Sequence, residues 1–154
     1  VPFVNLVETR WCSIQVANTV CTTILFTLVF NASIVHYPLM QRQPSIWKMN
    51  LFRTLAAFLV PTIIEFGTEV YMYRLHFDKK RQRALMLLVL ILIWIITIGG
   101  AIPLHVRLAY HPWNQSAFET LLIVNWIRVS LWGIRFVFGT IAAAAQDDNV
   151  RPLI

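Results

Sequence analysis

Long runs of apolar residues, separated by short polar segments, dominate the pattern along this chain. Four of these runs reach the roughly 20 residues that a helix needs to cross the hydrocarbon core of a bilayer. They cover residues 11–36, 51–73, 84–106 and 117–141. A β-barrel would instead need strands that alternate apolar and polar residues, and the run Ala84–Ile98 shows no alternation. The pattern predicts an all-α fold, a four-transmembrane-helix bundle that forms a single membrane domain over residues 1–154.

Local signals predict where these helices end and break. Pro38 is expected to end the first helix, because proline lacks the backbone N–H of the helix ladder. Ser116 and Glu119 have the spacing of a capping box, which predicts that the fourth helix begins there. The pair Gly99–Gly100, followed by Pro103, predicts an interruption near the end of the third helix.

Charge is scarce and unevenly placed, and its placement predicts an orientation. Charged residues make up 13% of the sequence, against roughly 25% in soluble proteins. Five basic residues fall within the ten positions 74–83. Because short connections rich in Lys and Arg stay in the cytoplasm, we predict that this loop and both termini are cytoplasmic. The connections account for the net charge of +6, so nucleic acid is not an expected partner; the lipid bilayer is.

Ionisable side chains also occur inside the predicted spans, where they usually face the interior of a bundle. Glu65 and Glu69 share one face of the second helix. Asn125, Arg128 and Arg135 share one face of the fourth. Counting about 1.5 Å per residue from the predicted helix ends puts Glu65 near the level of Arg128, and Glu69 level with Arg135. We predict these two ion pairs, which either lock the helices together or line a polar pocket.

Two histidines lie at corresponding ends of predicted helices. His36 ends the first helix and His105 the third, with His111 in the following connection. Residues at one level are candidates to ligate a metal or a haem iron, or to bind a quinone-like head group. Ordinary histidines at the membrane interface are the alternative. The sequence contains no HxxxH, HExxH or CxxCH motif, no nucleotide-binding loop and no GxSxG.

Four short boxes in this chain resemble those of an uncharacterised family of small bacterial four-helix membrane proteins. The boxes are Val35–Leu39 (VHYPL), the spacing Pro61–Glu65, Pro103–His105 (PLH) and Asn125–Arg128 (NWIR). The family is loosely similar in size and layout to anthrone-oxygenase-like membrane proteins. The resemblance implies a bacterial inner-membrane location and one shared polar site. That site would be formed by His36, Glu65, His105, Asn125 and Arg128. It implies no substrate.

Two classes of function are consistent with these features. In the first, the polar site binds a ligand or cofactor, and one version is a small oxidoreductase. His36 and His105 would then bind the metal, haem or quinone-like group, while Glu65 carries a proton beside Arg128 and Asn125. In the second, the chain is a non-catalytic accessory subunit of a larger membrane complex, and it could also form a homo-oligomer. A small oligomeric transporter is a third possibility.

Overall fold

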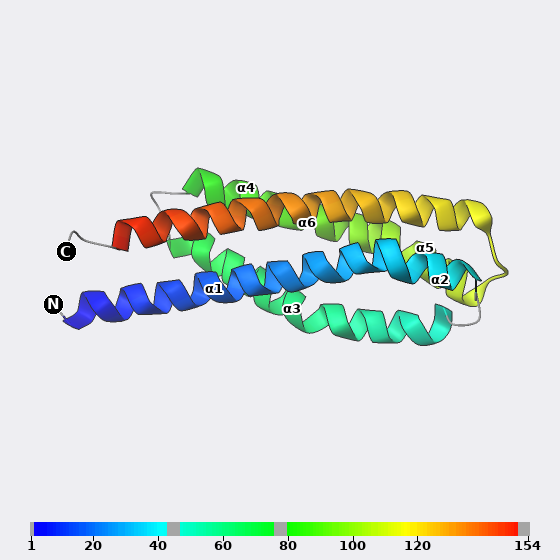
Figure 1. The fold of residues 1–154 in the computed structure, drawn as a ribbon, viewed down its shortest axis with the longest axis horizontal. Helices are drawn as coiled ribbons and strands as arrows, with labels where there is room; N and C mark the ends of the chain where they lie inside the picture. The colour runs from blue at the N-terminus through cyan, green and yellow to red at the C-terminus, as the bar shows by residue number, and fades with distance from the viewer. Residues whose placement is uncertain (1, 43–46, 76–79, 151–154) are drawn as a thin grey trace.

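A bundle of four antiparallel helical rods forms the fold (Figure 1). The computed structural model describes residues 2–42, 47–75 and 80–150. The rods are α1 (Pro2–Asn31) with a π-helical turn (Ala32–His36) and α2 (Tyr37–Arg42); α3 (Trp47–Leu75); α4 (Lys80–Ile96) with a π-helical turn (Thr97–Ala101) and α5 (Ile102–Tyr110); and α6 (Gln115–Val150). We call the end that carries α2 and α5 the distal end. The beginning of α1 and the end of α6 lie together at the opposite, proximal end (Figure 1).

Each rod contains a segment that is long and apolar enough to cross a membrane. These segments are Ser13–Leu39, Arg53–Arg74, Lys80–Tyr110 and Gln115–Ile141. The prediction of an all-α bundle with four helices long and apolar enough to cross a membrane is confirmed, and it indicates an integral membrane protein. The connection predicted at 74–83 is shorter than expected, because α3 continues to Leu75 and α4 begins at Lys80; its residues 76–79 lie outside the described residues.

The first rod does not end before Pro38, contrary to the sequence-based expectation. In the π-helical turn that precedes this proline, the backbone N–H of Tyr37 bonds to the carbonyl of Ala32, five residues back. The wider turn accommodates a residue that has no N–H to donate, so the helix continues into α2. The third rod repeats this arrangement, since Ile102 N–H bonds to the Thr97 carbonyl just before Pro103. The predicted interruption is thus a π-helical turn.

The beginning of α6 also differs from the expectation. Asn114 Oδ1 accepts a hydrogen bond of 2.9 Å from the backbone N–H of Ala117, and asparagine caps a helix as well as serine does. Ser116 already lies within α6. Glu119 Oε1 instead accepts a hydrogen bond of 3.0 Å from Gln115 Nε2. The predicted capping box is therefore wrong, and the helix begins two residues earlier.

Apolar side chains fill the interior at two levels. The distal cluster consists of Tyr37, Ala101, Leu108, Ala109, Ala117, Phe118 and Leu121. The second cluster, Leu25, Val29, Leu90, Ile93, Val129 and Trp132, lies nearer the middle. Large apolar residues also cover the outside, as at Leu88, Ile95 and Ile98 on the third rod. A surface of this kind suits contact with lipid, and it leaves the interior for the polar side chains.

Candidate ligand-binding site

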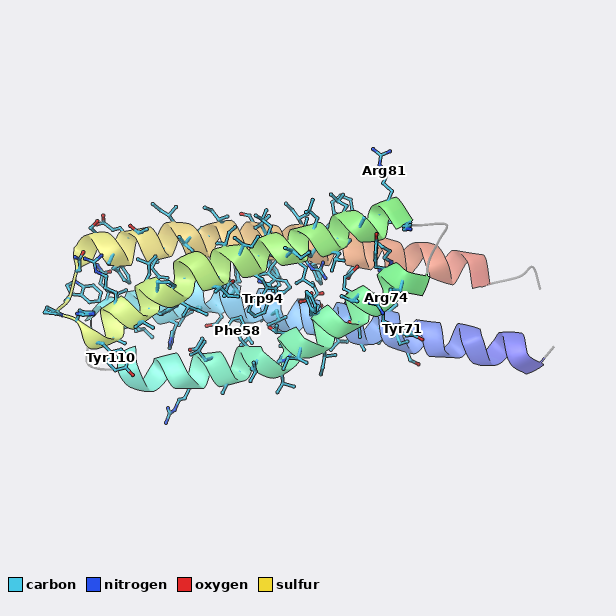
Figure 2. All side chains as sticks on the ribbon, turned by 180° about the vertical axis from the view of Figure 1, so that it is seen from behind. Phe58, Tyr71, Arg74, Arg81, Trp94 and Tyr110 are labelled. Carbon is cyan, nitrogen blue, oxygen red and sulfur yellow. The ribbon has the colours of Figure 1, made fainter. Side chains whose placement is uncertain are left out.

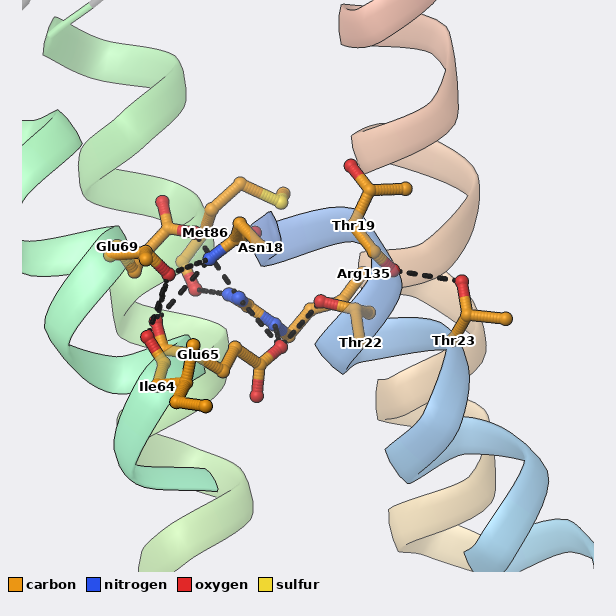
Figure 3. A network of polar contacts seen from close by, with 10 residues as sticks. Asn18, Thr19, Thr22, Thr23, Ile64, Glu65, Glu69, Met86 and Arg135 are labelled. Carbon is orange, nitrogen blue, oxygen red and sulfur yellow. Dashed lines mark hydrogen bonds and ion pairs between the residues drawn. The ribbon is translucent and has the colours of Figure 1, made fainter. Parts of the chain in front are cut away.

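A network of polar side chains crosses the interior near the middle of the bundle (Figure 3). We call its members, Asn18, Thr22, Glu65, Glu69 and Arg135, the central network, and all of them are buried. Arg135 Nη2 lies 3.1 Å from Glu65 Oε1 and 3.2 Å from Glu69 Oε2. Its Nη1 donates a hydrogen bond to the carbonyl of Met86. One guanidinium on α6 is thereby tied to α3 and α4 together.

Side chains of α1 complete the central network. Thr22 Oγ1 donates a hydrogen bond of 2.5 Å to Glu65 Oε1. Asn18 Nδ2 donates to Thr68 Oγ1 at 2.8 Å and to the backbone carbonyl of Glu65 at 3.3 Å. Glu65 Oε1 also accepts a bond of 3.3 Å from Arg135 Nε. Several charge-assisted hydrogen bonds converge on one carboxylate oxygen, which holds α1, α3 and α6 in a fixed register.

Of the two predicted ion pairs, the pair of Glu69 with Arg135 is confirmed and the pair of Glu65 with Arg128 is wrong. Arg135 binds both carboxylates. Arg128 donates its Nη1 hydrogen bond to Asn125 Oδ1 at 3.2 Å instead.

The error lies in the helix beginnings from which depth was counted. The second rod begins at Trp47 rather than residue 51, and the fourth at Gln115 rather than 117. Counted from these observed beginnings at about 1.5 Å per residue, Glu65 lies about 27 Å deep and Glu69 about 33 Å. The same rise puts Arg135 at about 30 Å, between the two carboxylates, and Arg128 at only about 20 Å. A shift of a few residues in the helix beginnings therefore brings Arg135, rather than Arg128, to the level of the two carboxylates.

Arg83 is a buried residue that the sequence placed in a basic loop. It lies in the first turn of α4, with its Nη2 at 3.5 Å from Gln15 Oε1 of α1. Its place among five basic residues concealed this role, because an arginine at a helix end usually extends into water. The polar stripe of α1 that begins at Gln15 was the available signal.

A cavity of about 220 Å³ lies between the rods on the distal side of the central network. We call it the distal cavity. Figure 2 shows Phe58 of α3 and Trp94 of α4 in the space between these two helices. The lining residues are Val29, Ala32, His36, Tyr37, Thr54, Leu55, Phe58, Leu59, Thr62, Ile93, Trp94, Thr97, Ala101, Ile102, His105, Asn125, Arg128 and Trp132. Most of this lining is apolar, and no Asp or Glu belongs to it among the residues that the structure describes.

Asn125 and Arg128 lie one turn apart on α6 and present their polar groups to the distal cavity. Asn125 is held in place from α1, because its Nδ2 donates to Ser33 Oγ and, at 3.3 Å, to the Val29 carbonyl. Its Oδ1 in turn accepts the hydrogen bond from Arg128. The guanidinium carbon of Arg128 lies 5.9 Å from the centre of the Phe58 ring, within the range of a cation–π contact. Within the described part of the chain, Arg128 forms no ion pair.

Both predicted histidines line the distal cavity, and each follows or ends a π-helical turn. His36 is the last residue of the turn before α2, and His105 lies in the first turn of α5. Turns of this kind often occur at functional sites, because they redirect the side chains that follow. Tyr37 Oη lies 3.0 Å from His105 Nε2, which links the first rod to the third beside the cavity.

The structure brings together all but one of the predicted site residues. His36, His105, Asn125 and Arg128 line the distal cavity, whereas Glu65 belongs to the central network. The tryptophans were missed as site residues: Trp94 and Trp132 line the cavity as well. Their positions within apolar runs gave no sequence signal that separates them from core residues.

Four polar atoms around the distal cavity are buried without a hydrogen-bond partner among the residues that the structure describes. They are His36 Nε2, Trp94 Nε1, Arg128 Nε and Trp132 Nε1. Buried polar groups are rarely left unpaired, and each one costs about 1–3 kcal/mol. The two indole groups and the guanidinium can only donate. The cavity therefore presents several hydrogen-bond donors without matching acceptors.

Metal ligation needs a different kind of cluster. Among the residues whose side chains the structure describes, no three His, Cys, Asp or Glu gather closely enough to hold a metal ion. His111 lies away from the distal cavity, on a separate surface depression with Trp113. The donor set of the cavity suits an oxygen-bearing organic group better than a metal.

Comparisons with protein-family models, curated proteins and solved structures give no match to this chain.

Proposed function

We propose that this integral membrane protein binds a small amphipathic molecule in the distal cavity, with a head group that accepts hydrogen bonds. The observation that carries the proposal is the set of unpartnered polar atoms around an otherwise apolar cavity. Ligand sites are typically apolar with a few polar groups that fix orientation. A carbonyl or an oxyanion is the kind of acceptor that the donors of Trp94, Trp132 and Arg128 lack among the described residues.

The mouth of the cavity supports entry from the bilayer. Leu55 and Leu59 line the cavity and are also 42% and 58% exposed on the outside of α3. They join the cavity to the exposed apolar side chains of Val60 and Ile63 on α3, so a ligand with an apolar tail can reach the donors without crossing water. The volume of about 220 Å³ is below the roughly 300–1,000 Å³ of complete small-molecule sites. The head group fits inside while the tail extends past Leu59 into lipid.

The same site accommodates the redox version of the proposal. A quinone-like head group carries carbonyl oxygens for the donors around Arg128, and His36 and His105 lie beside it as proton-exchanging groups. Glu65 is not part of this site, because it is bonded within the central network. The oxidoreductase version therefore rests on the histidines alone.

A pair of substitutions on α3 tests the binding proposal. Leu59→Trp would fill the mouth of the cavity, whereas Val60→Trp adds the same bulk at an equally exposed position, 61% against 58%, outside the lining. We expect protein purified from membranes in mild detergent to carry a bound small molecule, seen by native mass spectrometry and absorption spectroscopy. Leu59→Trp should lose it and Val60→Trp should keep it. Equal retention by both variants would exclude the cavity as the site.

The accessory-subunit alternative makes a different prediction for the same preparation. A subunit of this kind would co-purify with a large membrane complex, and wild type and Leu59→Trp would both lack a bound molecule. That outcome would replace the ligand-binding proposal.

We further propose that the proximal end faces the cytoplasm of a bacterial inner membrane, and that the distal cavity lies toward the opposite side. The excess of basic residues in the α3–α4 connection supports this orientation. In a background without Cys12 and Cys21, a membrane-impermeant thiol reagent should label Arg81→Cys from the cytoplasmic side and His111→Cys from the other. Both native residues are exposed, and Arg81 extends outward from α4 (Figure 2). Labelling of both positions from one side contradicts the four-span arrangement.

A further inference from the structure

We infer that the head group bound in the distal cavity is an anion, held by Arg128. This inference rests on the binding proposed above and narrows its ligand to an acidic amphipathic molecule, as distinct from a neutral quinone-like one.

The charge of Arg128 has no counter-charge among the described residues. The residue is 8% exposed and forms no ion pair among the described residues. The described lining of the cavity contains no carboxylate, and Glu65 and Glu69 of the central network are bonded to Arg135. A charged side chain inside the membrane is costly unless an opposite charge accompanies it. The described residues supply none at this point, so a ligand is the natural source.

The neighbours of Arg128 do not balance its charge. The Oδ1 atom of Asn125 accepts one guanidinium hydrogen bond, and the ring of Phe58 contacts the guanidinium face. Both are neutral, so they orient the charge without balancing it. The Nε–H of Arg128 remains unpartnered within the described chain. An oxyanion would supply both the missing acceptor and the missing charge, and arginine binds carboxylates and phosphates with well-defined geometry.

Two further hydrogen-bond donors line the same cavity. The indole N–H groups of Trp94 and Trp132 have no acceptor among the described residues and line the same cavity. Each oxygen of a carboxylate or phosphate accepts more than one hydrogen bond. A single anionic head group can thus satisfy donors from α4 and α6, whereas a neutral carbonyl would leave the charge of Arg128 unbalanced.

An acidic head group on an apolar tail has two sources in a membrane, a free fatty acid and an anionic phospholipid. Their shared chemistry is an oxyanion joined to hydrocarbon, and their tails distinguish them. Binding of palmitate, hexadecanol, phosphatidylglycerol and diacylglycerol to delipidated protein in detergent would separate the sources. The charged and neutral probes form matched pairs, and quenching of tryptophan fluorescence together with calorimetry would report binding. Palmitate is used at a pH where the acid is ionised.

We expect wild-type protein to bind one acidic probe about 10- to 100-fold more tightly than its neutral partner, as charge-assisted hydrogen bonds imply. Arg128→Gln should lose that preference, and Arg128→Lys should keep part of it. Arg53→Gln is the matched control, because Arg53 is exposed on α3 and outside the lining; it should bind as wild type does. Preference for palmitate identifies a fatty-acid-like ligand, and preference for phosphatidylglycerol a phospholipid.

Two results would overturn the inference while leaving the binding proposal intact. One is equal affinity of wild type for hexadecanol and palmitate, and for diacylglycerol and phosphatidylglycerol. The other is an unchanged preference in Arg128→Gln. If Arg128→Gln cannot be purified, the comparison of charged and neutral probes on wild type decides by itself. If wild type binds none of the four probes and does not bind a neutral ubiquinone analogue either, the proposed function is refuted.

Discussion

Arg135 in the central network and Arg128 in the distal cavity lie seven residues apart on one face of α6, and both are buried. Arg135 contacts two carboxylates and a backbone carbonyl. Arg128 contacts an amide and an aromatic ring. The same residue type therefore meets a complete set of partners at one level and an incomplete set at the next. Buried polar atoms without a partner among the described residues occur at both levels, but only those around Arg128 line a cavity. The comparison indicates that burial of an ionisable group is not by itself a sign of a ligand site; a missing counter-charge beside an open space is.

The helices and side chains around the two arginines also differ. Around Arg135, donors from α1 and carboxylates from α3 meet in direct contact. Around Arg128, two rods contain π-helical turns and a cavity opens between them. Direct ion pairs between regular helices suit a structural role, although Glu65 Oε2 and Glu69 Oε1 have no hydrogen-bond partner among the described residues. Interrupted helices around an open space suit binding. Each of the following substitutions tests this contrast.

Arg135→Gln is expected to have the largest effect. It leaves two buried carboxylates, 0% and 1% exposed, without their counter-charge. Losing one partner of a buried ion pair destabilises a protein by about 3–5 kcal/mol. Unfolding in mixed micelles of mild detergent and dodecyl sulfate would measure the free energy of unfolding. Adding Glu65→Gln and Glu69→Gln to Arg135→Gln should recover part of the loss, because the three charges are removed together.

Unchanged stability of Arg135→Gln would contradict a structural role for the central network. If Arg135→Gln unfolds at the dodecyl sulfate fraction of wild type, the central network does not stabilise the bundle. Arg53→Gln again serves as control, since an exposed arginine should change stability by no more than about 0.5 kcal/mol.

Thr22→Val should have a smaller but measurable effect on the same network. The substitution keeps the shape of the side chain and removes the hydroxyl that donates to Glu65 Oε1 at 2.5 Å. A hydrogen bond to a charged group contributes about 1.5–3 kcal/mol. Thr23→Val is the matched control, because its hydroxyl bonds only within α1, to the Thr19 carbonyl at 2.8 Å. Equal losses in the two variants would assign the effect to helix propensity rather than to the network.

The sequence was sufficient for the fold but only partly for the site, and helix geometry explains the difference. Apolar runs of about 20 residues report spans whatever the details of packing, so four helices could be predicted. The pairing of Glu65 required the axial register to within one helical turn, about 5.4 Å. The predicted beginnings of the second and fourth helices were wrong by four and two residues, which is enough to substitute Arg128 for Arg135.

The polar residues that line the distal cavity show what the sequence pattern can contribute. His36, His105, Asn125 and Arg128 were each identified from polarity in apolar surroundings, and they do share a cavity. The tryptophans could not be identified in this way, because an indole within an apolar run is equally consistent with packing. Their N–H groups acquire meaning only when the absence of an acceptor among the described residues is known.

Arg128→Met should have the smallest effect on the unliganded protein, and for that reason it tests the comparison most directly. Replacement by an apolar side chain of similar length removes a buried charge that has no counter-charge in the described chain, and such replacements are often neutral or stabilising. It also removes the hydrogen bond to Asn125 Oδ1, so we expect the free energy of unfolding of delipidated protein to change by less than about 1 kcal/mol. Added palmitate or phosphatidylglycerol should stabilise wild type and leave Arg128→Met unchanged, because a ligand shifts stability only where it binds. Measured by the same micelle titration, a loss as large as that of Arg135→Gln would mean that Arg128 is a structural residue like its neighbour and that the two levels of α6 do not differ.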